Sequence, residues 1–135
     1  MVHICLTGAS GFVGRQVLKS LKARGHRVTV TLRPGRALPA GYGADGVIET
    51  PDLFAENADF WKEKLAGIDA LIHAAWYVEP GKYLDSPCNL DCVRGTLTLV
   101  EGAVAAGIRH VIGVGTCMEY RLPGDHLDVD HPLGA

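Results

Sequence analysis

The stretch Thr7-Gly8-Ala9-Ser10-Gly11-Phe12-Val13-Gly14 decides the fold of this chain. It follows an apolar run from Val2 to Leu6 and opens a helical pattern of apolar residues. A strand, a glycine-rich turn and a helix in that order form the first half of a dinucleotide-binding unit. Gly8 permits the sharp turn off the strand, and Gly11 lets the backbone approach a pyrophosphate. Gly14 lies in the first helical turn, where a Cβ would hold the helix and the strand apart.

The helix that follows the glycines also contributes to the expected site. Its free N–H groups and the positive end of its dipole favour a phosphate at its first turn. Its apolar pattern is carried by Phe12, Val13, Val17, Leu18 and Leu21. We therefore predict that a cofactor contacts six residues of the turn: Gly8, Ser10, Gly11, Phe12, Val13 and Gly14.

The length and composition of the chain limit the classes of protein to consider. With 135 residues, 47% of them hydrophobic, the chain is long enough for one domain with a core. The net charge is −2 and no basic run occurs, so a nucleic-acid partner is not expected. Neither a charged leader nor a long apolar segment occurs, so we expect a protein that is neither secreted nor membrane-spanning. The four cysteines form no CxxC pair, which is typical of reduced cysteines in a cytoplasmic protein.

The rest of the chain alternates strands and helices. Strands are predicted at 27–32, 47–49, 69–74 and 110–114, and helices at 54–66 and 89–106. The last helix is apolar at Leu90, Val93, Leu97, Val100 and Val104. The first, fourth and fifth strands look buried rather than strictly alternating, which indicates a parallel sheet covered on both faces. We predict an α/β fold, a Rossmann-type doubly wound parallel sheet of strand order 3-2-1-4-5, with ligands at the carboxyl ends of strands 1 and 4.

The end of the second strand usually selects between NAD and NADP. An acid there would accept a hydrogen bond from the ribose 2′-hydroxyl of NAD. This chain has Arg33 instead, with Arg36 three residues on and no Asp or Glu nearby. Two guanidinium groups suit a 2′-phosphate, which they can bind bidentately. NADP(H) is therefore the favoured cofactor and NAD(H) the alternative, although the same arginines could simply be solvated loop residues.

Three further positions carry chemistry, each with a structural alternative. Asp52 could accept a hydrogen bond from the adenine amino group, cap the helix predicted at 54–66, or do both. His73, in an otherwise apolar strand, is more typical of a hydrogen-bonded core histidine than of a catalytic one. Thr116, just past the fifth strand, could hydrogen-bond a substrate oxygen or be an ordinary strand-end threonine. No metal is expected, because metal-site spacing is lacking among His126, Asp128, Asp130 and His131.

Five segments, in order along the chain, resemble the extended short-chain dehydrogenase/reductases. They are TGASGFVG at 7–14, PDL at 51–53, LIHAAW at 71–76, GT at 95–96 and VIGVGTCMEY at 111–120. This family contains NAD(P)-dependent epimerases, dehydratases and reductases that act on nucleotide sugars. The loops AWYVEPGKYL at 75–84 and GTCMEY at 115–120 are similar to those of bacterial sugar-nucleotide 4-ketoreductases of the CDP-abequose synthase type.

The resemblance implies a function and a set of site residues. It implies an enzyme, homodimeric when complete, that transfers a hydride at a 4-keto carbon of a nucleotide-activated sugar. Thr116 takes the place of the family's catalytic Ser/Thr, four residues before Tyr120. The implied cofactor contacts beyond the glycine turn are Asp52, Leu53, Ala74, Ala75 and Trp76, and the implied substrate contacts are Cys117, Met118 and Glu119.

Two departures from the family pattern affect this interpretation. Cys92 stands where the family usually has an asparagine, three residues before the helical Gly-Thr. The family's catalytic Tyr-x-x-x-Lys is absent, because glycine or proline stands four residues after each of the four tyrosines. We therefore expect residues 1–135 to be the amino-terminal portion of a longer enzyme, truncated before the last strands and the substrate domain. The alternative is a non-catalytic NAD(P)-binding module or sensor.

Overall fold

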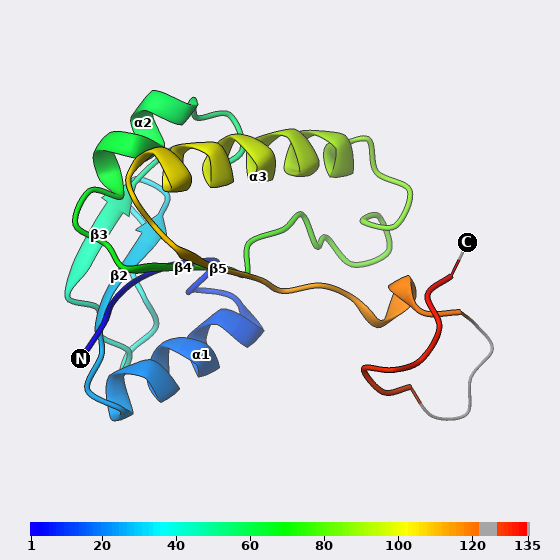
Figure 1. Cartoon of the computed structure of the whole chain (residues 1–135), viewed down its shortest axis with the longest axis horizontal. Coiled ribbons are helices and arrows are strands. Elements are labelled where there is room, and N and C mark those ends of the chain that lie inside the picture. Colours follow the sequence, from blue (N-terminus) through cyan, green and yellow to red (C-terminus); the bar gives the residue numbers. More distant parts are fainter. Residues whose placement is uncertain (122–126, 135) are drawn as a thin grey trace.

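A five-stranded parallel sheet forms the centre of the structure, a computed structural model that describes residues 1–121 and 127–134 except for the side chain of Met118 (Figure 1). The strands are β1 (His3–Thr7), β2 (Arg27–Leu32), β3 (Gly46–Glu49), β4 (Ala70–His73) and β5 (His110–Gly113). The helices are α1 (Phe12–Ala23), α2 (Ala58–Lys64), α3 (Cys88–Ala105) and the short 3₁₀ helix η1 (Cys117–Glu119). The strand order β3-β2-β1-β4-β5 confirms the predicted Rossmann-type topology.

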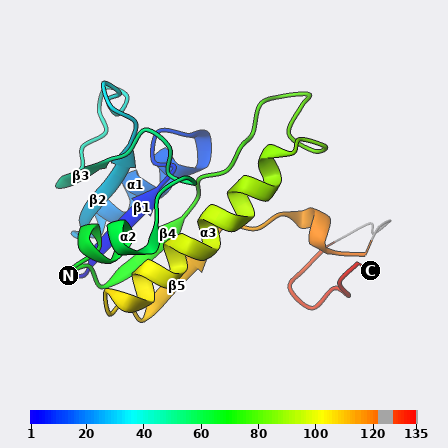
Figure 2. The same cartoon turned by 90° about the horizontal axis from the view of Figure 1, so that it is seen from above.

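The sheet carries helices on both faces. Figures 1 and 2 show α1 on one face and α2 together with α3 on the other. The central strand β1 pairs with β2 on one side and β4 on the other, so that Leu6 lies opposite both Val30 and Ile72. Because all the pairings are parallel, the carboxyl ends of the strands lie along one edge of the sheet. That edge carries the loop from β1 to α1 and the loop that leaves β4.

Two apolar clusters fill the space between the sheet and its helices. The cluster beside α1 consists of Leu6, Ala9, Leu18, Val28, Val30 and Leu32. The cluster beside α2 and α3 consists of Cys5, Ile48, Trp61, Leu65, Ile68, Leu71, Leu99, Ala103 and Ile108. Neighbouring residues of β1 thus point to opposite faces, which is why this strand reads as a continuous apolar run. Burial also raises the pKa of the Cys5 thiol to about 12, so this cysteine is an inert core residue.

The helix after β3 is shorter than predicted, because α2 begins at Ala58 rather than at residue 54. Its cap is Asn57, whose side-chain oxygen accepts a hydrogen bond from the Phe60 N–H at 2.8 Å. The alternative in which Asp52 caps this helix is therefore wrong. The Asp52 carboxylate instead accepts a hydrogen bond from the Phe54 N–H at 3.0 Å and closes a separate turn. Both Asp52 and Asn57 are residue types that cap helices, and α2 begins after Asn57, the one nearer to its first residue.

The apolar stripe of α3 does not face the sheet. Its exposed members, between 46% and 66% accessible, are Leu90, Val93, Leu97 and Val104. The buried face consists of Cys92, Gly95, Leu99, Gly102 and Ala103. A Cβ at Gly95 would overlap the backbone of Phe54, and one at Gly102 would overlap the side chain of Trp61. The neighbouring segments approach α3 so closely at Gly95 and Gly102 that only the face that carries these glycines can be buried.

The strand β5 is exposed at each of its four residues, whereas the sequence predicted a buried strand. It lies at the edge of the sheet and pairs only with β4 among the strands of residues 1–121. The predicted burial was wrong because β-branched residues such as Val111 and Ile112 favour a strand but do not determine whether helices cover the faces of that strand. Together with the half-buried Val100, the exposed stripe on α3 has the 3-4-3-4 spacing of a helix that packs against another helix.

Candidate functional site

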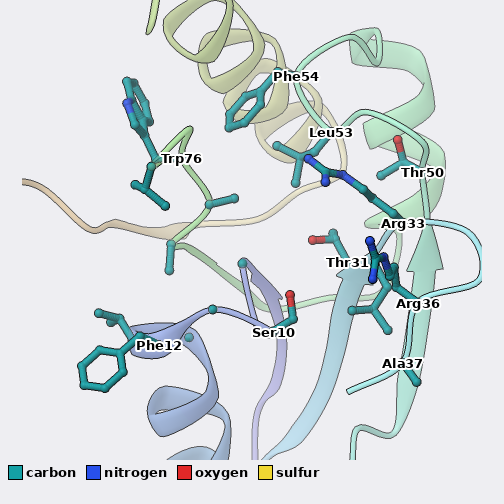
Figure 3. Close-up of a pocket in the computed structure, with 18 residues that line it drawn as sticks. Ser10, Phe12, Thr31, Arg33, Arg36, Ala37, Thr50, Leu53, Phe54 and Trp76 are labelled. Atoms are coloured by element: carbon teal, nitrogen blue, oxygen red, sulfur yellow. The ribbon is translucent and has the colours of Figure 1, made fainter. Parts of the chain in front are cut away.

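A pocket of about 600 Å³ opens at the carboxyl ends of β1, β2 and β4 (Figure 3). Of the predicted cofactor contacts, all except Asp52 line it: Gly8, Ser10, Gly11, Phe12, Val13, Gly14, Arg33, Arg36, Leu53, Ala74, Ala75 and Trp76. The sequence interpretation missed the other lining residues, Thr31, Leu32, Ala37, Thr50, Phe54 and Val78. Each of these lies within two residues of a predicted one, so widening each predicted segment would have found them.

The glycine turn brings three backbone segments together at the pocket. Gly8 has a φ of +72°, and a Cβ there would lie 2.6 Å from the carbonyl oxygen of Ala74. A Cβ at Gly14 would overlap the carbonyl oxygen of Gly8. These geometries confirm the turn predicted at Gly8 and the close helix–strand contact predicted at Gly14. At Gly8, Gly11 and Gly14, which all line the pocket, no side chain stands between the backbone and the pocket.

The first turn of α1 has the features of an anion site. Its N-cap is Gly11, which has no side chain to cap the helix, and its first turn contains no acidic residue. Phe12 and Val13 are 76% and 49% exposed, and both line the pocket. Neither joins the core, although their apolar character suggested it. Uncapped N–H groups at the positive end of a helix dipole bind anions such as phosphate.

The two arginines lie on the side of the pocket formed by β2. The Arg36 N–H donates to the Arg33 carbonyl oxygen at 3.0 Å, so both side chains leave one tight turn. Figure 3 shows the side chains of both arginines across the pocket from Phe12 and Trp76. Neither arginine forms an ion pair within residues 1–121 and 127–134, and no Asp or Glu lines the pocket. This end of the pocket therefore carries two cationic side chains and no carboxylate among its lining residues.

His73 is a buried, hydrogen-bonded core histidine, as the sequence favoured. Its Nδ1 lies 2.7 Å from Thr7 Oγ1, and its Nε2 lies 3.0 Å from Thr96 Oγ1. Burial lowers the pKa of its imidazole, so the ring is neutral at pH 7. The same Thr7 Oγ1 accepts the N–H groups of Ala74 and Ala75 at 3.2 and 3.3 Å. This network joins β1, β4 and α3 directly behind the pocket.

An aromatic wall closes the end of the pocket that lies away from the arginines. Trp76 and Phe54 meet edge to face, with their ring centroids 6.3 Å apart. The Trp76 indole N–H donates to Asn89 Oδ1 at 2.9 Å, and the Asn89 amide N–H donates to the Tyr83 carbonyl oxygen at 2.6 Å. The loop after β4 is thus held to the first turn of α3, which fixes the indole at the pocket.

The predicted residues after β5 do not line this pocket. Thr116, Cys117 and Glu119 are exposed on the segment that contains η1, and Met118 shares that segment. Asp52 lies on the turn beside Leu53, which does line the pocket. His126, one of the residues considered as metal ligands, lies outside the described residues.

No group of three or more His, Cys, Asp or Glu residues close enough to hold a metal ion occurs in 1–121 and 127–134. In the same part of the chain, every helix is too short or too polar to cross a membrane. The four cysteines, Cys5, Cys88, Cys92 and Cys117, are all free thiols.

Comparison with known proteins relates this pocket to a family. The family model for the NAD dependent epimerase/dehydratase family matches residues 4–132. The chain is 27% identical over 131 residues to the dTDP-6-deoxy-L-talose 4-dehydrogenase (NAD(+)) of Aggregatibacter actinomycetemcomitans, covering 97% of this chain and 47% of that protein. It is 31% identical over 134 residues to the UDP-glucose 4-epimerase of Rhizobium meliloti (strain 1021), covering 95% and 39%.

A solved structure extends the likeness to three dimensions. MoeE5, in complex with UDP-glucose and NAD, matches with a TM-score of 0.73 and 26% identity, over 98% of this chain and 42% of that one. The chain therefore spans less than half the length of these relatives. The family model nevertheless matches nearly all residues of this chain, and the chain therefore belongs to the NAD dependent epimerase/dehydratase family.

Proposed function

We propose that this chain is the cofactor-binding part of an NADP(H)-dependent oxidoreductase or epimerase that acts on a nucleotide-activated sugar. The observation that carries the proposal is the pocket, in which a glycine-rich turn and a helix N-terminus without a side-chain cap meet two arginines and no acid. Membership of the family supports a dinucleotide as the ligand. The names of two relatives, a 4-dehydrogenase and a 4-epimerase, support hydride transfer at the C4 carbon of the sugar.

The residues present fit a nicotinamide dinucleotide along the length of the pocket. The first turn of α1 would hold the pyrophosphate, since its N-cap Gly11 has no side chain and the turn contains no acidic residue. Arg33 and Arg36 would hold the 2′-phosphate, with adenine near Leu53 and Asp52. The remaining contacts would come from Ala74, Ala75 and Trp76. Such a cofactor supplies hydride transfer, and the protein supplies its binding and orientation.

The catalytic and substrate residues form a second part of the proposal. Thr116 would donate a hydrogen bond to the reacting sugar oxygen, and Cys117, Met118 and Glu119 would face the sugar. The proton transfer is not assigned, because no tyrosine in residues 1–135 is followed by lysine at the fourth position. The complete enzyme would be a cytoplasmic homodimer. In that assembly, another helix would cover the exposed apolar stripe of α3.

The lack of Tyr-x-x-x-Lys also favours a second candidate, a non-catalytic NAD(P)-binding module. The two candidates differ in turnover and not in binding. We would mix the full natural chain with NADPH and a nucleotide 4-keto-sugar and follow the nicotinamide absorbance. Oxidation of NADPH with formation of the 4-hydroxy sugar supports the enzyme, whereas binding without turnover supports the module.

The cofactor preference is expected to depend on Arg33. A charge-assisted hydrogen bond to a 2′-phosphate contributes about 1.5–3 kcal/mol before solvent screening, so one surviving bond favours NADPH over NADH by about ten-fold. In Arg33→Ala this preference is expected to fall towards unity while the affinity for NADH stays unchanged. Titration of both cofactors into the wild type and the variant measures this. Equal affinities of the wild type for NADPH and NADH would mean that both arginines are solvated loop residues.

Turnover by the full natural chain is expected to depend on the Thr116 hydroxyl. A neutral hydrogen bond lost only in the transition state costs about 1–1.5 kcal/mol, so Thr116→Val should lower kcat about ten-fold. The dissociation constant for NADPH should change by less than about two-fold, because no cofactor contact is removed. Thr116→Ser, which keeps a hydroxyl, is the control. Unchanged turnover in the valine variant would make Thr116 a structural residue.

A further inference from the structure

Charge is distributed unevenly along this chain. Seven of the thirteen lysines and arginines lie in residues 1–44, and no aspartate or glutamate precedes Asp45. Residues 45–135 contain the other six cations together with all fifteen acids. The seven cations are spaced along the chain, so they form no basic run. A long segment that carries cations and no acids is typical of a surface that meets an anionic ligand or partner.

Three of the seven cations form one stripe on α1. Arg15, Lys19 and Lys22 are spaced by four and three residues, which places them on one side of the helix. We call these three residues the cationic stripe. Lys22 pairs with Asp45 at 2.6 Å, and the Asp45 carboxylate also accepts the Val28 N–H at 2.7 Å. At Lys22, the stripe therefore reaches the segment between β2 and β3.

The other end of the stripe lies at the pocket. Helix α1 begins at Phe12, which lines the pocket, and the Arg15 guanidinium lies 5.5 Å from the centre of the Phe12 ring. Lys19 is seven residues beyond Phe12, about 10 Å along the helix axis at a rise of about 1.5 Å per residue. The stripe therefore leads to the pocket, which two further cations, Arg33 and Arg36, line.

The charge of Arg15 and Lys19 is available to a ligand. Lys19 is exposed, and neither residue forms an ion pair within residues 1–121 and 127–134. Figures 1 and 2 show α1 on the face of the sheet opposite α2 and α3. The helices of that other face carry the acids Asp59, Glu63, Asp91 and Glu101. The sheet therefore separates the stripe from these acids.

We propose that the cationic stripe attracts the phosphates of the dinucleotide and raises the rate at which the cofactor enters the pocket. This proposal rests on the proposed function, since it takes NADPH as the ligand. NADPH carries about four negative charges on its pyrophosphate and 2′-phosphate, and NADH carries about two. Charges of opposite sign outside a site raise the association rate, and salt weakens the effect. Because the stripe does not line the pocket, it acts before the cofactor is bound and leaves the dissociation rate unchanged.

Lys19→Glu tests the stripe without altering the pocket. At 0.1 M salt, where the Debye length is about 10 Å, we expect the association rate constant of the full natural chain for NADPH to fall about three-fold. The constant for NADH, which carries half the charge, should fall by less than about two-fold, and both dissociation rate constants should stay unchanged. At about 1 M salt the Debye length is only about 3 Å, and the variant should bind as fast as the wild type. Stopped-flow measurement of nicotinamide fluorescence gives these rates.

Lys62→Glu is the matched control. Lys62 is exposed on α2, on the other face of the sheet, and forms no ion pair within residues 1–121 and 127–134. The same change of charge there should alter NADPH association at 0.1 M salt by less than about 1.5-fold. Equal losses in Lys19→Glu and Lys62→Glu would mean that net charge alone sets the rate, and would overturn the proposal.

The outcomes separate the stripe from the proposed function. If Lys19→Glu binds NADPH at the wild-type rate at 0.1 M salt, the role of the stripe is overturned and the proposed function stands. If the wild type binds neither NADPH nor NADH, the proposed function is contradicted and the stripe has no dinucleotide to attract. Heparin, a polyanion, serves as the competing ligand. Heparin binding that is lost in Lys19→Glu while NADPH association stays unchanged would assign the stripe to another anionic partner and overturn the proposal.

Discussion

Replacing Gly14 with alanine is expected to weaken NADPH binding about 100-fold and to lower stability. The new Cβ would overlap the carbonyl oxygen of Gly8, which is backbone and cannot rotate away as a flexible side chain could. Overpacking of this kind costs about 1–3 kcal/mol, and the upper end of that range corresponds to two decades of affinity. The strain falls on the turn whose amides are proposed to hold the pyrophosphate. Titration with NADPH, together with denaturant unfolding, measures both effects.

The control for this prediction is Gly43→Ala. Gly43 has no positive φ, and a Cβ there meets nothing within 4 Å, so the same chemical change is made in open space. We expect unchanged NADPH affinity and a stability equal to the wild type or up to about 1 kcal/mol higher. Wild-type affinity in Gly14→Ala would mean that the helix can move off the strand without disturbing the site.

Replacing Trp61 with alanine is expected to lower the free energy of unfolding by about 3–5 kcal/mol. Trp61 is fully buried in the cluster under α2 and α3, and its ring meets that of Phe60 edge to face with centroids 5.0 Å apart. Its Cβ also fills the space opposite Gly102 of α3. Because small domains are stable by only about 5–15 kcal/mol, this loss is a large fraction of the total. Equilibrium unfolding in urea measures it.

Trp61→Phe provides the matched comparison. The Trp61 Nε1 is buried without a hydrogen-bond partner in the structure, and an unpaired buried donor costs about 1–3 kcal/mol. Phenylalanine keeps an aromatic ring in the cluster and removes that donor. We therefore expect Trp61→Phe to lose at least about 2 kcal/mol less than Trp61→Ala. Equal losses in the two variants would mean that the volume of the indole, and not the aromatic core contact, decides stability here.

Much of the candidate site could be predicted because its residues follow strand ends in the sequence. Adjacent residues are enough to identify each of its segments. These are the glycine turn after β1, Arg33 and Arg36 after β2, and Ala74–Trp76 after β4. A parallel sheet then brings these strand ends to one edge. Phe54 was missed because it reaches the pocket through a turn closed by Asp52, and that turn was interpreted as the start of a helix.

The sequence by itself determined the strands and the glycine turn, because these depend on short-range patterns that a few adjacent residues carry. The parallel strand order then followed from the crossover rules of α/β folds. Only the tertiary structure decided which face of α3 is buried. Leu90 and Leu97 look like core residues, yet the close approach of Phe54 and Trp61 selects Gly95 and Gly102 instead. It also decided the hydrogen-bond partners of Thr7, which are two amides and a histidine more than sixty residues away. Contacts between distant segments fix this packing and these hydrogen bonds, and no local pattern encodes them.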